Sequence, residues 1–165
     1  MGASGDETKA VDAALALWEQ RGGTWTADPE LATLARDCRA AAAATWDAYR
    51  SLDVVAGCAA CAAHNPGGCC FPEVGQGLGQ TALLANLLLG VALPRAGMVP
   101  GSCFFVGAQG CRLLIRDAFC VNYFCPAQEQ RLGAATLARL AGLAGRENLA
   151  AATLETALAR WLARG

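Results

Sequence analysis

Residues 57–70 read Gly-Cys-Ala-Ala-Cys-Ala-Ala-His-Asn-Pro-Gly-Gly-Cys-Cys, and this stretch holds four of the chain's nine cysteines. Its first pair, Cys58 and Cys61, has the two-residue spacing with which a loop places two sulfurs on one side of a turn. Asn, Pro and Gly favour turns, so residues 65–68 predict a reversal that leads back to the adjacent Cys69 and Cys70. The stretch therefore predicts a loop that wraps a metal ion or a cluster.

The remaining cysteines of this region lie far apart in the sequence. Cys103, Cys111, Cys120 and Cys125 are separated by seven, eight and four residues. A zinc site usually takes two closely spaced cysteine pairs, with the sulfurs within roughly 4 Å of one another. Dispersed cysteines are instead typical of ligands gathered around a polynuclear iron-sulfur cluster. The candidate ligands are Cys58, Cys61, Cys69, Cys70, Cys103, Cys111, Cys120 and Cys125.

Length and composition predict one globular domain. The chain has 165 residues, of which 55% are apolar, enough for a core of its own. We divide it into N-terminal helices (1–53), a cysteine-cluster module (54–125) and C-terminal helices (126–165). Only five charged residues fall within 54–125, so we expect this module to be mostly buried. The net charge of −1 and the scattered arginines argue against nucleic acid and anionic membranes as partners.

The sequence also predicts the compartment and the state of the thiols. The N-terminus lacks the features of a secretion or myristoylation signal, and a cytoplasmic location follows. The most apolar run, residues 81–93, is shorter than the roughly 20 residues of a membrane-spanning helix. A reducing cytoplasm keeps thiols free, so we expect metal binding rather than disulfides, although oxidised or unliganded thiols remain an alternative.

Helical periodicity runs through both flanks of the cysteine region. Asp28 can cap a helix that Pro29 opens. Glycines mark two expected ends, at Gly22-Gly23 and at Gly145. No window shows sustained strand alternation, so the predicted fold class is all-α, a small helical bundle enclosing a cysteine-rich metal- or cluster-binding loop region. The expected helices cover residues 7–20, 29–52, 78–93, 127–144 and 147–163.

Two residues outside the ligand set need separate interpretation. Cys38 falls on the apolar face of the helix expected over 29–52, so we predict a buried core thiol. His64 is the only histidine and follows Cys61 in the predicted loop. It could bind the metal, hydrogen-bond to a residue that binds the metal, or donate a proton. Alternatively, it is a solvent-exposed loop residue beside Asn65.

Two arginines and a group of aromatic residues lie close to the downstream cysteines. Arg112 and Arg116 bring positive charge to a charge-poor region, where it would favour thiolates and an anionic cluster. Alternatively, Arg116 forms an ion pair with Asp117 or Glu73. For the aromatic side chains we expect an apolar shell around the site rather than a ligand-stacking box; they are Phe104, Phe105, Phe119, Tyr123 and Phe124.

The order of the cysteines resembles that of the YkgJ-like family of CxxCxxCC cysteine-cluster proteins. The resemblance covers about 70 residues. Residues 58–70 look like the opening CxxC…CC element of the family, Cys103-Phe104-Phe105 with Gly110-Cys111 looks like its next element, and residues 116–120 resemble its R-P-x-x-C element, with Cys125 as an extra or terminal ligand. The resemblance implies a zinc- or iron-chelating domain, in some members an iron-sulfur oxidoreductase.

Together these observations predict an iron-sulfur protein that binds one or two clusters, of the [4Fe-4S] type. It would act in electron transfer with a redox partner protein, or in redox or sulfur chemistry at the cluster. Whether it is an enzyme, such as an iron-sulfur-dependent oxidoreductase, is left open. The alternatives are a zinc-stabilised structural or interaction module and a metal-chelating protein for storage or delivery.

Overall fold

The computed structural model describes residues 3–64 and 68–164 of the chain. Over these residues it has seven helices and one small two-stranded hairpin, which confirms the predicted all-α fold class. In chain order the elements are α1 (Ala3–Ala27), α2 (Pro29–Ser51), α3 (Val54–His64), α4 (Pro72–Gln76), α5 (Gln80–Leu88), β1 (Val106–Gly107), β2 (Gly110–Cys111), α6 (Ala118–Asn122) and α7 (Pro126–Ala163).

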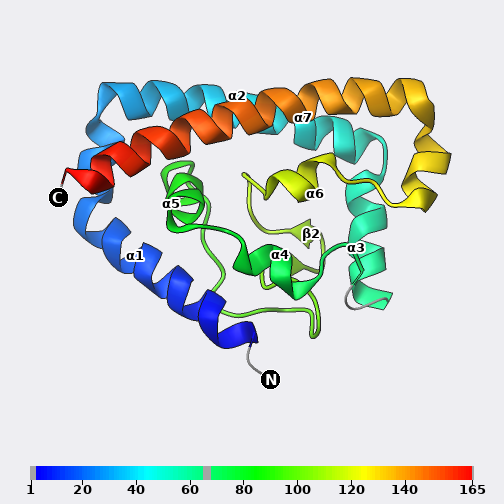
Figure 1. Ribbon diagram of the computed structural model, residues 1–165, viewed down its shortest axis with the longest axis horizontal. Helices are drawn as coiled ribbons and strands as arrows, with labels where there is room; N and C mark the ends of the chain where they lie inside the picture. The colour runs from blue at the N-terminus through cyan, green and yellow to red at the C-terminus, as the bar shows by residue number, and fades with distance from the viewer. Residues whose placement is uncertain (1–2, 65–67, 165) are drawn as a thin grey trace.

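The long helices form a frame around the segments that carry the cysteines (Figure 1). α2 packs along α7, and α5 contacts both α1 and α7. α4, α6 and the hairpin lie within this frame, and α3 closes one side of it. The largest buried cluster lies where α1, α2, α5 and α7 meet, and it includes the fully buried Trp25, Leu31, Leu84 and Leu158.

α2 begins where its sequence predicts. Asp28 has extended backbone angles, and its carboxylate accepts a hydrogen bond from the Leu31 N–H at 2.9 Å. Pro29 occupies the first helical turn, where its missing N–H leaves no bond unmade. Cys38 lies on the inner face of α2 with no exposed surface, which confirms the predicted core position.

The predicted end of the first helix at Gly22-Gly23 is wrong, because α1 continues to Ala27. A Cβ at Gly22 would lie 2.7 Å from the indole of Trp18, so glycine serves here to let that ring lie flat against the helix. The added turn buries Trp25, whose ring lies 6.1 Å from that of Trp18. Burial of two aromatic rings offsets the roughly 1 kcal/mol that each helical glycine costs.

The C-terminal region divides at a different glycine from the one predicted. α7 runs through Gly145, so the predicted end there is wrong. Gly145 is exposed and meets no other side chain, whereas Ala144 and Glu147 beside it are buried, and this packing holds the helix together. The interruption occurs at Gly133, where φ is 72° and ψ is 161°, a combination that favours glycine.

α5 is the buried helix expected over 78–93, although it is shorter, ending at Leu88. Its Asn86 is fully buried and binds the irregular segment that follows the hairpin. The Asn86 side-chain oxygen accepts hydrogen bonds from the N–H groups of Leu114 (2.9 Å) and Ile115 (3.1 Å), and its amide nitrogen donates to the Ile115 carbonyl at 3.0 Å. Asn86 thereby fixes the segment that leads to Arg116.

We expect Asn86→Ala to lower the free energy of unfolding by about 2–3 kcal/mol. The substitution leaves buried backbone groups of residues 114 and 115 without partners, and each such group costs about 1–3 kcal/mol. Urea titration followed by circular dichroism measures the loss. The control is Asn122→Ala, an exposed helical asparagine for which we expect less than about 0.5 kcal/mol. Equal effects of the two substitutions would contradict the role of Asn86.

The hairpin and the hydropathy of the helices complete the fold. β1 and β2 pair antiparallel, with Val106 opposite Cys111 and Gly107 opposite Gly110. Over the described ranges, 3–64 and 68–164, no helix has both the length and the apolar character needed to cross a membrane.

Candidate metal centre

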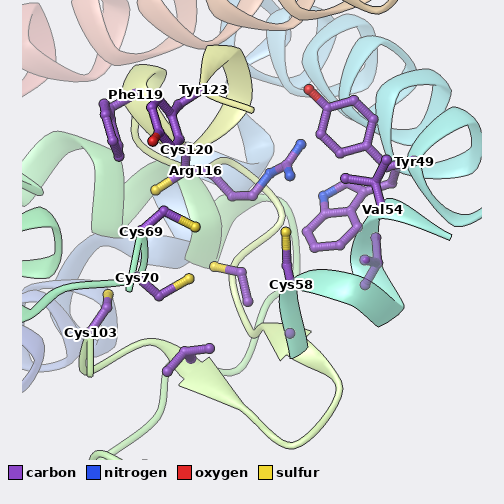
Figure 2. A pocket seen from close by; sticks show the side chains of 15 residues that line it. Tyr49, Val54, Cys58, Cys69, Cys70, Cys103, Arg116, Phe119, Cys120 and Tyr123 are labelled. Atoms are coloured by element: carbon purple, nitrogen blue, oxygen red, sulfur yellow. The ribbon is translucent and has the colours of Figure 1, made fainter. Parts of the chain in front are cut away.

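Six of the eight candidate cysteines line one cavity of about 80 Å³. They come from five separate segments: α3, the turn before α4, the loop before β1, β2 and α6. In Figure 2 the labelled cysteine side chains surround this space, with Phe119 and Tyr123 on one side and Tyr49 and Val54 on another. The six are Cys58, Cys69, Cys70, Cys103, Cys111 and Cys120.

Cys58 and Cys61 lie on a helix, so the predicted turn at this pair is wrong. The alanines that surround both cysteines favour helix over turn. Cys58 reaches the cavity, but Cys61, one turn later, does not line it. Residues 65–67 of the predicted reversal lie outside the described residues.

Two residues predicted at or near the centre, His64 and Cys125, do not line the cavity, and Cys38 lies in the main core as predicted. His64 is exposed, and its ring Nδ1 lies 2.8 Å from the carbonyl oxygen of Ala60 in its own helix. Cys125 occupies the N-cap position of α7 and does not line the cavity. Cys38 belongs to the main core, where burial raises the pKa of its thiol to about 12. The structure therefore brings together six of the predicted ligands and leaves Cys61 and Cys125 at the margin.

Three of the cavity thiols contact one another. Cys58 and Cys70 each donate a hydrogen bond to the sulfur of Cys69, which lowers the pKa of Cys69 to about 3. The same hydrogen bonds, with burial, raise the pKa of Cys58 and Cys70. A thiolate at Cys69 would therefore be stabilised by the two neighbouring thiols.

The other three cavity thiols are kept neutral by their surroundings. Burial raises the pKa of Cys111 to about 11 and that of Cys120 to about 12, and it also raises the pKa of Cys103. Arg116 acts in the opposite direction on Cys111 and Cys120. Metal ligation requires thiolates, so the charge of a bound metal would have to draw off these protons.

Arg116 lies at the cavity wall and is held by α2 and α7. Its guanidinium is 4.3 Å from the centre of the Trp46 ring and 5.0 Å from that of Tyr49. It also forms an ion pair with Glu147, at an N–O distance of 3.5 Å, and both side chains are more than nine-tenths buried. The predicted partners were Asp117 or Glu73, and Asp117 instead caps α6 through the Phe119 N–H at 2.8 Å.

Two close backbone approaches hold Cys103 in place. Its N–H donates a hydrogen bond to the Cys70 carbonyl at 2.6 Å. Its sulfur lies against Gly75, where a Cβ would lie only 3.0 Å from the Sγ. Nothing local in the sequence marks this contact, because only the folded chain brings Gly75 and Cys103 together.

We expect Gly75→Ala to destabilise the protein by about 1–3 kcal/mol, the usual cost of overpacking a buried position. The added methyl group would displace the Cys103 sulfur. The matched control is Gly79→Ala, because a Cβ at that exposed position meets nothing within 4 Å. Urea unfolding of both variants tests the contact. A Gly75→Ala protein as stable as the Gly79→Ala protein would show that the sulfur has room to move.

The aromatic residues divide into two groups. Phe104 and Phe105 are buried in the main core, and Phe124 packs edge-on against Tyr49, so these three rings do not line the cavity. Phe119 and Tyr123 instead stack on each other with ring centres 4.8 Å apart and are 38% and 45% exposed at the cavity. One side of the centre is therefore covered by two rings that also touch solvent.

The cavity gathers thiols, the side chains that hold sulfur-bound metal centres. Among the residues described, no three His, Cys, Asp or Glu side chains come close enough to hold a single metal ion. The six thiols around this largely apolar cavity exceed the four that one iron-sulfur cluster takes.

Comparison of the chain with protein-family models, with curated proteins and with solved structures found no match. The resemblance to the YkgJ-like family accordingly stays a prediction drawn from the cysteine pattern. The cavity and its thiols are the basis for assigning a function.

Proposed function

We propose that the protein binds an iron-sulfur cluster of the [4Fe-4S] type and acts in electron transfer, or in redox or sulfur chemistry at the cluster. The observation that carries this proposal is the convergence of six thiols, from five segments of the chain, on one cavity. Iron-sulfur clusters are held by cysteine thiolates. The ligands named by the proposal are the six cavity cysteines, with Cys61 and Cys125 at the margin.

The number of thiols at one cavity favours a cluster over zinc. Four sulfurs that bind one zinc ion lie about 2.3 Å from it and so within roughly 4 Å of one another. No such single-ion group exists among the described side chains, although the cavity has more thiols than one ion needs. Sulfurs spread around a space suit a cluster, because each binds a different iron atom.

The surrounding residues would support a cluster in two ways. The buried guanidinium of Arg116 supplies positive charge beside Cys111 and Cys120, which stabilises thiolate ligands. The apolar walls limit access of water, which influences the reduction potential of a bound cluster. A bound cluster would supply one-electron chemistry, and a redox partner protein would exchange electrons at the side formed by Phe119 and Tyr123.

Metal and sulfide analysis of the anaerobically purified full chain tests the proposal. We expect a brown protein with matched iron and acid-labile sulfide, whose visible absorption bleaches with dithionite. A colourless protein with stoichiometric zinc and no sulfide would overturn the proposal and favour a zinc-stabilised structural module.

A further inference from the structure

A second, more open cavity adjoins the thiol cavity. It is a groove of about 570 Å³ that α2, α3, the hairpin and the segments on either side of the hairpin line together. This volume is within the range of small-molecule sites, roughly 300–1,000 Å³. A molecule in the groove would lie against a sulfur that also faces the thiol cavity, because four residues line both spaces: Trp46, Val55, Gly110 and Cys111.

The charge in the lining of this groove is of one sign. Among the described residues that line it, the charged ones are Arg50 and Arg112, and none is acidic. Arg112 donates hydrogen bonds from Nη2 to the carbonyl oxygens of Ala96 at 2.8 Å and Phe104 at 2.7 Å. These bonds fix the guanidinium without neutralising it, since no carboxylate of the described chain forms an ion pair with Arg112.

Arg50 brings the second positive charge from α2. Its guanidinium lies 5.2 Å from the centre of the Trp46 ring, which keeps it beside the wall shared with the thiol cavity. Its acidic partner is Asp47 of the same helix, at an N–O distance of 3.2 Å, and both side chains are more than half exposed. Exposed ion pairs of this kind are weak, so Arg50 can also bind an anion that enters the groove.

The rest of the lining is mostly apolar. Met98 is 57% exposed, which is uncommon for a large apolar side chain. A Cβ on Gly107 would lie 3.2 Å from Cδ of Arg112 and 3.5 Å from Sδ of Met98, so an apolar and a charged side chain lie over the same point of the hairpin. The other apolar side chains of the lining include Val55, Val91, Leu113 and Leu114. Apolar walls with a few fixed charges suit an organic molecule of opposite charge.

We infer that this groove binds the substrate of the centre and that the substrate is a small organic anion, a carboxylate or a phosphate ester. Arg112 and Arg50 bind its charge, because guanidinium groups form charge-assisted hydrogen bonds with both kinds of anion. Its apolar body lies against Trp46 and Met98. Binding requires only the groove, whereas the role of the bound anion as a substrate rests on the proposed function.

The test is isothermal titration calorimetry of the anaerobically purified full chain with three probes that share one ring system: 1-naphthoate, 1-naphthyl phosphate and the neutral 1-naphthamide. At least one of the anions should bind at least roughly tenfold more tightly than the amide, because only the anions form charge-assisted hydrogen bonds. The tighter anion identifies the class of substrate. In the reduced iron-loaded protein, the same anion should shift the electron paramagnetic resonance signal, since it lies against the Cys111 sulfur.

Two matched variants place the binding in the groove. Ala108 is an exposed residue of the hairpin turn that lines the groove, and Ala138 is exposed on α7, which contributes no residue to the lining. Ala108→Glu adds a negative charge in the groove and should weaken binding of the anion at least roughly fivefold. Ala138→Glu adds the same charge elsewhere and should leave the affinity unchanged. Arg50→Gln should also weaken binding of the anion and leave that of 1-naphthamide unchanged.

Equal affinity of the wild type for all three probes, or no detectable binding of either anion, would overturn the inference. Equal effects of Ala108→Glu and Ala138→Glu would overturn the placement in the groove. A brown protein with matched iron and sulfide that fails these tests loses the substrate site and keeps the proposed function. A colourless zinc protein that passes them keeps an anion-binding groove, and the proposed function is then wrong. The comparison of the three probes needs no substitution, so it decides the matter even if a variant folds poorly.

Discussion

Cys70→Ala is expected to lose bound iron and to unfold at a clearly lower denaturant concentration than the wild type. Cys70 lines the cavity, hydrogen-bonded to the Cys69 sulfur and, through its carbonyl, to the Cys103 N–H. Metal binding that requires the folded site contributes its free energy to folding, so a lost ligand weakens both. Iron analysis together with urea unfolding measures the two effects on one sample.

Cys38→Ala is the matched control for this prediction. It also removes one buried thiol, but from the main core rather than from the cavity. We expect a packing loss of about 1 kcal/mol and an unchanged iron content. Loss of the visible absorption in the Cys38→Ala protein, with retention in the Cys70→Ala protein, would show that the ligands have been assigned wrongly.

Arg116→Met should destabilise the protein by about 3–5 kcal/mol, because it leaves the buried carboxylate of Glu147 without its ionic partner. Methionine keeps most of the side-chain volume against Trp46. The double variant Arg116→Met/Glu147→Gln removes both charges and should recover most of the loss. Urea unfolding followed by far-ultraviolet circular dichroism is the measurement, because the fluorescence of Trp46 changes with its neighbour.

The same variant should show a defined dependence on pH. Burial already raises the pKa of Glu147 in the folded protein, and Arg116 opposes that rise. Without the arginine the folded-state pKa goes higher still, so the folded protein keeps a proton that the unfolded chain has lost. The penalty is then full above the folded-state pKa and disappears below the unfolded value near 4.3. Arg116→Met should therefore lose more stability at pH 8 than at pH 5, and an equal loss at both would contradict this account.

Sequence signals predicted correctly those features that depend on interactions within one or two helical turns. Asp28 and Pro29 fix the start of α2 because a cap and a proline act within one turn, and helical spacing placed Cys38 in the core. The helix ends predicted at glycines were wrong because the conformation of these glycines depends on packing with other residues. Gly22 and Gly145 stay helical because of what packs beside them, and Gly133, which nothing in the sequence distinguished, adopts the non-helical conformation.

At the candidate site, too, the sequence predicted the residue types but not the features that depend on how distant helices pack. Residue type was enough to select the eight cysteines, but not to separate the six at the cavity from Cys61 and Cys125, because that depends on how α3 and α7 are oriented. The partner of Arg116 could not be found locally either. Glu147 is distant in the sequence, and it reaches the arginine only because α7 packs along α2.

Leu114 and Ile115 lie in an irregular segment, outside the helices and strands of the described chain. Trp46 donates a hydrogen bond to the Leu114 carbonyl at 3.0 Å, and Asn86 bonds the other three backbone groups of these two residues. The side chains of Trp46 and Asn86 thus satisfy the backbone hydrogen-bonding groups of this segment, as a neighbouring strand does in a sheet. The stretch that delivers Arg116 to the sulfurs is consequently anchored in α2 and α5, so the electrostatics of the centre are set by the interior of the protein and are insulated from movements of its surface loops.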